Sequence, residues 1–136
     1  MVFEGITVIA LEQAVAAPLC TRRLAQKGAE VIKIERETGD FARHYDSAVK
    51  GQSAYFVWLN GGKKSVVLNL EDEQHKATLA SLVESADILV QNLKPGTLSK
   101  LGLDLDEWHG NNPRLISCSI SGFAPDGPGF SRKAYD

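Results

Sequence analysis

Basic side chains follow the apolar segments of this chain at points where strands are expected to end. Arg36 comes shortly after the apolar run 31–34, and Lys94 comes after the segment 87–92, with Lys100 close behind. Arginine offers phosphate oxygens a planar fork of donors, and lysine offers them a point charge. These residue types favour a site for a phosphorylated nucleotide. The alternative interpretation is that they are solvated basic side chains at strand ends.

A turn of small residues, 13–17, follows the first apolar run and leads into a helix that begins near Pro18. The free N–H groups at such a helix start favour anionic or carbonyl oxygens. The turn contains neither a GxGxxG pattern nor a P-loop. Close packing of the helix on the strand explains the small residues equally well.

Strands and helices alternate along the chain, which predicts an α/β fold with a doubly wound, mainly parallel sheet. Because neighbouring parallel strands end at one edge of the sheet, the basic residues should share a crevice there. The segment 53–60 could form a short helix or a strand. Strands are expected at 6–11, 31–34, 65–70, 87–92 and 115–120, and helices at 18–27, 72–85, 97–101 and 104–110. Since the last strand lacks a covering helix, the sheet is expected to be incomplete at the C-terminus.

The composition is that of an ordinary soluble globular protein, with 43% hydrophobic and 24% charged residues and a formal net charge of −2. No basic block suggests nucleic acid, no segment is long enough to cross a membrane, and no spacing suggests a metal site. Cys20 and Cys118 lie in apolar segments. We expect buried, reduced thiols in a cytoplasmic protein, with one structural disulfide as the alternative.

Several segments then occur in an order typical of one enzyme family: 28–35, 86–92, 94–96, 112–116 and 119–123. With them, the chain resembles the N-terminal part of the class III CoA-transferases, the group of the formyl-CoA and carnitine CoA-transferases. The resemblance implies that residues 1–136 belong to a Rossmann-like domain that binds coenzyme A. It also implies acyl-CoA and a carboxylic acid as substrates, no metal, and a homodimer whose full-length subunits interlock as two rings.

The resemblance also implies the positions of the site residues. Lys133 is expected among the residues that bind CoA, and Tyr135 and Asp136 are expected to support catalysis beside the reacting acyl group. The turn near the thioester and the CoA pocket are expected to comprise Ala14, Val15, Ala16, Arg36, Leu68, Asn69, Leu70, Glu71, Asn92, Leu93, Lys94 and Lys100.

In the family mechanism, an aspartate attacks the thioester and forms an acyl-aspartyl anhydride. The resemblance places that aspartate beyond residue 136, so this chain alone is expected to be inactive. Val15 stands where formyl-CoA transferases have glutamine, which disfavours formyl and oxalate substrates, and the segments 39–43 and 55–60 are most similar to members that use dicarboxylic acids. Tyr135 stands where family racemases have histidine, which favours a transferase. An acyl-CoA racemase or isomerase, or a non-catalytic nucleotide-binding module, remains the alternative.

Overall fold

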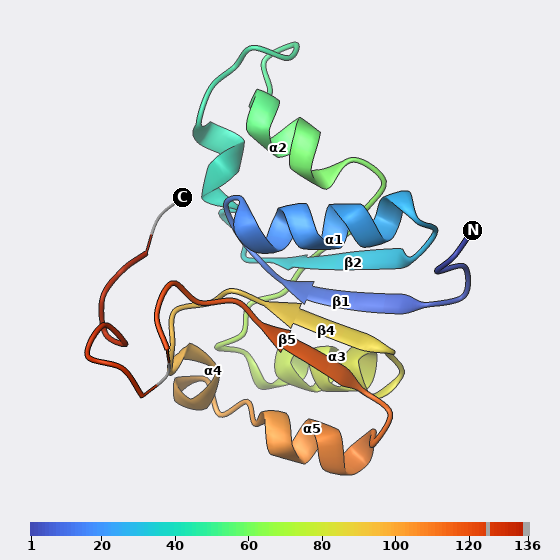
Figure 1. Cartoon of the computed structure of the whole chain (residues 1–136), viewed down its shortest axis with the longest axis vertical. Helices are drawn as coiled ribbons and strands as arrows, with labels where there is room; N and C mark the ends of the chain where they lie inside the picture. The colour runs from blue at the N-terminus through green and yellow to red at the C-terminus, as the bar shows by residue number, and fades with distance from the viewer. Residues whose placement is uncertain (125, 135–136) are drawn as a thin grey trace.

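The computed structural model describes residues 1–124 and 126–134, and its centre is one five-stranded sheet (Figure 1). The strand order is β3-β2-β1-β4-β5, and all four pairs of neighbouring strands are parallel. The chain thus winds outward from β1 in both directions, which confirms the doubly wound α/β prediction. The strands are β1 (Thr7–Leu11), β2 (Glu30–Glu35), β3 (Lys64–Val67), β4 (Ile88–Gln91) and β5 (Ile116–Ser119).

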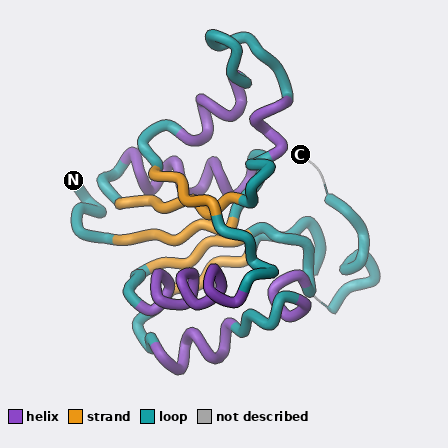
Figure 2. The backbone as a smooth tube through the Cα atoms, turned by 180° about the vertical axis from the view of Figure 1, so that it is seen from behind, coloured by secondary structure: helices purple, strands orange, loops and turns teal. Residues whose placement is uncertain are grey.

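Helices cover both faces of the sheet, as Figures 1 and 2 show from opposite sides. One layer consists of α1 (Ala16–Gln26) and α2 (Ala54–Asn60), with the short 3-10 helix η1 (Phe41–His44) beside α2. The other layer consists of α3 (Glu73–Glu84), α4 (Thr97–Lys100) and α5 (Leu105–Asn111).

The two cores lie on opposite faces of the sheet, and β1 contributes to both. Ile9 and Leu11 pack into the cluster that also contains Trp108 of α5, whereas Val8 and Ala10 pack into the cluster beneath α1. Successive side chains of a strand point to opposite faces. A strand covered on both faces therefore needs a continuous apolar run, and this explains the sequence of β1.

Local signals in the sequence set the ends of two helices as predicted. Gly28 follows α1 with a φ of +105°, a conformation that glycine adopts without a Cβ clash. Asp72 precedes α3, and its carboxylate accepts hydrogen bonds from the N–H groups of Gln74 and His75. The segment 53–60, left open between helix and strand, forms α2.

Two predictions were wrong in detail. The strand expected at 65–70 ends at Val67, because the N–H of Leu68 makes the last bond to β2 and the N–H of Asn69 instead donates to Nδ1 of His75. Neither cysteine is fully buried: Cys20 is partly exposed and Cys118 is exposed, since β5 is an edge strand. Both thiols are free, so they form no disulfide.

Within the residues described, no helix combines the length and apolar character needed to span a membrane.

Candidate functional site

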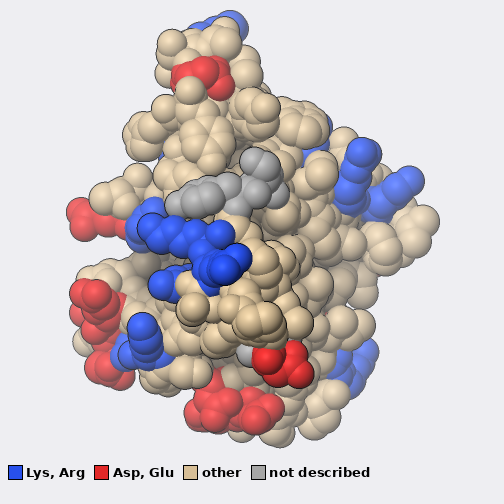
Figure 3. Space-filling view, turned by 60° about the vertical axis from the view of Figure 1, so that its left-hand side comes forward, with Lys and Arg blue, Asp and Glu red and all other residues tan. Residues whose placement is uncertain are grey.

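A cleft of about 500 Å³ lies where β1, β2, β3 and β4 end. Figure 3, which turns this edge of the sheet toward the reader, shows a hollow bordered by both basic and acidic side chains. Ligands of open α/β sheets bind outside the carboxyl ends of the strands, where this cleft lies. Its lining comprises Leu11, Glu12, Gln13, residues 34–40, residues 68–71, Leu93, Thr97 and Leu101.

Six of the thirteen residues expected to bind CoA line this cleft. They come from three separate loops and are Arg36, Leu68, Asn69, Leu70, Glu71 and Leu93. The structure does not place the others in the lining: Ala14, Val15, Ala16, Asn92, Lys94, Lys100 and Lys133. Tyr135 and Asp136 lie outside the described residues. For all of these residues, inside or outside the lining, the role in CoA binding or catalysis remains a prediction.

Arg36 stands on the exposed rim of the cleft, at the end of β2. Its Nε donates to the carbonyl oxygen of Gly39 at 3.3 Å, which closes the turn that follows the strand. Gly39 has a φ of +75°, and a Cβ there would come within 2.9 Å of Arg43. Glycine thus lets the turn bend back tightly toward Arg36, which stays exposed.

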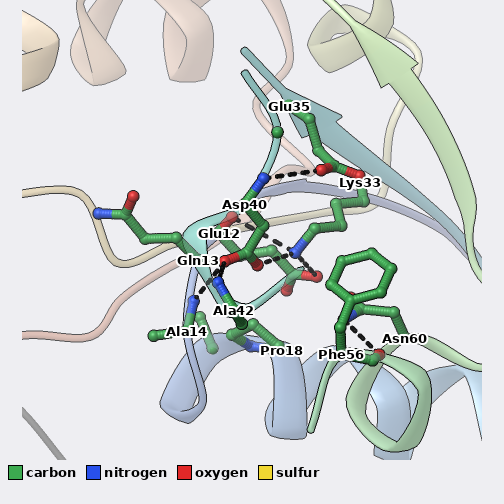
Figure 4. Close-up of polar contacts among 12 residues, drawn as sticks. Glu12, Gln13, Ala14, Pro18, Lys33, Glu35, Asp40, Ala42, Phe56 and Asn60 are labelled. Atoms are coloured by element: carbon green, nitrogen blue, oxygen red, sulfur yellow. Dashed lines mark hydrogen bonds and ion pairs between the residues drawn. The ribbon is translucent and has the colours of Figure 1, made fainter. Parts of the chain in front are cut away.

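Asn92, which follows β4, forms hydrogen bonds with the backbone of the turn after β1. Its Oδ1 accepts from the N–H of Gln13 at 2.9 Å, and its Nδ2 donates to the Gln13 carbonyl oxygen at 2.8 Å. The side chain of Gln13 itself extends away from the charged cluster beneath the turn (Figure 4). Asn92 therefore fixes the backbone of the turn after β1, a role that its position in the sequence did not indicate.

Ala14, the next residue of this turn, has a φ of +61°, a left-handed conformation that is unfavourable for alanine. Its N–H donates to Oδ1 of Asp40 at 3.0 Å. No side chain caps the N-terminus of α1 at Val15. The turn is thus held through its backbone by Asn92 on one side and by Asp40 on the other.

A buried group of charges lies under the turn (Figure 4). Lys33 of β2 is 1% exposed, and its Nζ lies 2.8 Å from Oδ2 of Asp40 and 3.5 Å from Oε1 of Glu12. Burial of an unpaired charge is very unfavourable, so these ions depend on one another. Phe56 covers the group, with its ring centroid 5.8 Å from the Lys33 ammonium.

Lys63 completes this group from the loop before β3. Its Nζ lies 2.6 Å from Oε1 of Glu12 and also donates to the carbonyl oxygen of Pro18 at 2.9 Å. Thr21 donates to the other oxygen of Glu12 at 2.5 Å. Burial lowers the pKa of Lys63, while the carboxylate of Glu12 acts in the opposite direction. Two lysines and two carboxylates thus balance one another inside the fold.

Glu35 forms a second polar group beside the first. Its two oxygens accept hydrogen bonds from Nε and one Nη of Arg43, at 2.8 and 2.6 Å. They also accept hydrogen bonds from the Ser65 hydroxyl and from the backbone N–H of Asp40. The Arg43 guanidinium in turn lies 3.8 Å from the centroid of the Phe56 ring. Bidentate pairing and stacking fix the arginine at the cleft edge.

These contacts predict acid lability. Burial raises the pKa of Glu35, but the hydrogen bonds from Arg43, Asp40 and Ser65 outweigh it and lower the pKa from its ordinary value near 4.5 to about 2. The stabilisation is therefore complete above pH 4.5 and is lost as the pH falls toward 2. We expect this group to contribute a loss of roughly 3 kcal/mol in the free energy of unfolding over that window.

Urea unfolding measured at steps between pH 5 and 2 checks this expectation. The variant Glu35→Gln lacks the carboxylate, so its stability should fall less steeply over the same window. Parallel curves for the two proteins would show that Glu35 is not the group responsible.

Sequence reasoning missed the buried charges, although one signal was present. Lys33 interrupts the apolar run 31–34, at a position on the same face of the strand as Val31 and Glu35. A charged residue at such a position indicates a buried partner. Of its partners, Asp40 follows seven residues later in the chain, whereas Glu12 comes from a more distant segment. Among residues 1–124 and 126–134, no group of three or more His, Cys, Asp and Glu side chains could hold a metal ion.

Comparisons with known proteins agree with this architecture. Residues 3–136 match the model of CoA-transferase family III. The chain is 43% identical over 135 residues to an acetyl-CoA:oxalate CoA-transferase of Acetobacter aceti, covering 98% of this chain and 35% of that protein. It is 36% identical to a succinyl-CoA:glutarate CoA-transferase of Mus musculus, covering 98% of this chain and 31% of that protein.

Solved structures show the same fold. The crystal structure of a hypothetical protein from Mycobacterium tuberculosis superposes with a TM-score of 0.91 at 37% identity, over 98% of this chain and 37% of that one. A CAIB/BAIF family protein from Brucella suis superposes with a TM-score of 0.89 at 36% identity, over 98% and 36%. The chain thus spans about a third of the length of the curated relatives described above.

Proposed function

Because this chain belongs to CoA-transferase family III, we propose that it forms the coenzyme A-binding part of an enzyme that transfers CoA between small carboxylic acids. In this proposal residues 1–136 are the N-terminal part of the large, CoA-binding domain. The whole enzyme is a cytoplasmic homodimer, and its substrates are an acyl-CoA and a free carboxylic acid.

The cleft at the carboxyl ends of the strands is the observation that carries the proposal. It brings Arg36, at the end of β2, to the same edge as residues 68–71 and Leu93. Its lining is apolar in part, at Leu11, Ile34 and Leu101, and also contains five acidic residues, Glu12, Glu35, Glu37, Asp40 and Glu71. Three of these, Glu12, Glu35 and Asp40, are paired with basic side chains of the protein. The apolar part and the cation on the rim suit a ligand that carries phosphates at one end and an apolar chain beyond them.

The chemistry in this proposal starts with a carboxylate contributed from outside these 136 residues. That aspartate attacks the thioester carbonyl, the C–S bond breaks, and CoA leaves as its thiolate, so that an acyl-aspartyl anhydride remains. The returning thiolate attacks the aspartyl carbonyl of this anhydride, which releases the donor acid as its carboxylate and leaves an aspartyl-CoA thioester. The acceptor carboxylate then attacks that thioester and releases the thiolate, which attacks the acceptor carbonyl of the second anhydride, so that the new acyl-CoA forms and the aspartate is freed. Tyr135 and Asp136 support these steps, and Ala14 to Ala16 lie near the thioester.

We propose small dicarboxylic acids as the substrate class. One of the relatives described above is named for two dicarboxylates, succinate as its CoA thioester and glutarate. The segments 39–43 and 55–60 support the same class, because they are most similar to members of the family that use dicarboxylic acids.

Calorimetric titration of CoA into the 136-residue chain tests the proposal. Arg36→Ala should weaken binding about ten- to hundredfold, because a hydrogen bond to a charged group contributes roughly 1.5–3 kcal/mol. Arg114→Ala is the matched control, since it removes the same charge from an exposed residue just before β5, at the opposite edge of the sheet. Absence of CoA binding, or equal weakening by both substitutions, would contradict the proposed site.

A further inference from the structure

One buried carboxylate joins two walls of the cleft. Oδ1 of Asp40 accepts from the N–H of Ala14, in the turn after β1, at 3.0 Å, and from the N–H of Ala42 in η1 at 2.9 Å. The backbone N–H of Asp40 donates to Oε2 of Glu35 at 2.9 Å. The turn after β1 and the loop that carries Arg36 therefore meet at this side chain.

The oxygens of Asp40 are already occupied by the protein. Oδ1 has its two backbone donors, and Oδ2 has the ammonium of Lys33 at 2.8 Å. Asp40 is only 3% exposed although it borders the cleft. A carboxylate paired in this way is suited to holding other groups in place and not to contacting a ligand itself.

Lys33 determines where this carboxylate lies. It stands in the middle of the sheet, on a strand paired with β1 and β3 on its two sides, so its own position is fixed by the fold. Its ammonium donates hydrogen bonds to Asp40 and to the backbone carbonyl oxygen of Glu12. Glu12 is the first residue of the turn after β1. Through Lys33 and Asp40, both walls of the cleft are therefore connected to the same rigid strand, β2.

We infer that Asp40, held by Lys33, is a positioning residue that sets the spacing between the turn at 12–16 and the Arg36 loop at 36–40. The inference rests on the proposed function, because the ligand that spans the two walls is taken to be CoA. A ligand that contacts both walls depends on their spacing. A smaller ligand that contacts one wall does not.

The test compares CoA with adenosine 3′,5′-bisphosphate, the nucleotide portion of CoA, by calorimetry at a temperature where circular dichroism shows each variant folded. Asp40→Ala removes both the charge and the acceptor for Ala14. We expect it to weaken CoA binding about tenfold and bisphosphate binding less than about threefold. Asp40→Asn keeps an oxygen that can accept from Ala14 and Ala42 but turns an amide N–H2 toward Lys33, so it should recover part of the affinity for CoA.

Asp46 supplies the matched control. Its Oδ1 also accepts from two backbone N–H groups, those of Ala48 and Ala54, but it does not line the cleft. Asp46→Ala should leave the ratio of the two affinities unchanged. If Asp40→Ala does not fold, Asp40→Glu takes its place, because it keeps the charge while an added methylene displaces the oxygens.

The outcomes separate the two claims. If the unsubstituted chain binds CoA and Asp40→Ala weakens both ligands equally or neither, the positioning role is overturned and the proposed function stands. If the unsubstituted chain does not bind CoA, the proposed function is overturned and this inference falls with it. A changed ratio that Asp40→Asn partly restores supports the positioning role.

Discussion

Replacing Lys33 by methionine should lower the free energy of unfolding by about 3–5 kcal/mol. Methionine matches the length of the lysine stem but leaves Asp40 without its cation and Glu12 with fewer partners. Both carboxylates are almost completely buried. Removing one partner of a buried ion pair leaves the other as an uncompensated charge, and this is far more costly than the loss of the pair itself.

Lys64→Met is the control for this prediction. Lys64 pairs with Glu30, but its side chain is 70% exposed, so both ions keep most of their hydration when the pair is broken. We expect a cost below about 1 kcal/mol. Urea unfolding followed by circular dichroism gives both values. A loss of similar size in the two variants would mean that the charges around Lys33 are hydrated in solution.

Sequence reasoning was successful for features that depend on nearby residues. The apolar run of β1, the glycine that ends α1 and the cap at Asp72 each carry a local signal, and the structure confirms them. Parallel pairing followed from the alternation of strands and helices, because a strand connected by a helix returns in the same direction. The same argument predicted that Arg36 lies at the edge of the sheet where the carboxyl ends of the strands meet.

The whole group of buried charges could not be predicted in this way, because two of its members, Glu12 and Lys63, lie far apart along the chain. Glu12 and Lys63 come from opposite ends of the first half of the sequence, and each by itself is typical of a surface turn. Only the fold brings them together beneath α1. The left-handed Ala14 is a similar case, since nothing in its neighbours requires that conformation and Asp40 stabilises it from another loop.

The exposure of Cys118 has a different cause. The thiol was expected to be buried because it lies in an apolar segment that was interpreted as a strand. The strand order instead places β5 at the edge of the sheet, where Ile116 is 63% exposed. Hydrophobic pattern alone does not distinguish a central strand from an edge strand whose faces are apolar. Sheet order, which depends on contacts between distant segments, decides it.

The two tryptophans should differ sharply when replaced by alanine. Trp108 of α5 is 4% exposed and packs with Leu79 and Val83 of α3, so Trp108→Ala leaves a large cavity and should cost about 3–5 kcal/mol. Trp58 of α2 is 49% exposed and has an edge contact with Tyr55. Trp58→Ala should therefore cost no more than about 1 kcal/mol.

The same comparison tests one wall of the cleft. Leu98 and Leu101 of the α4 region belong to the core cluster that contains Trp108, and Leu101 also lines the cleft. A cavity at Trp108 should thus loosen that wall and weaken CoA binding even at temperatures where the chain stays folded, whereas Trp58→Ala should not. Urea unfolding and calorimetry on both variants, with Trp108→Phe as the milder substitution, decide the matter. Equal costs for the two alanine variants would mean that α5 does not pack against α3 in solution.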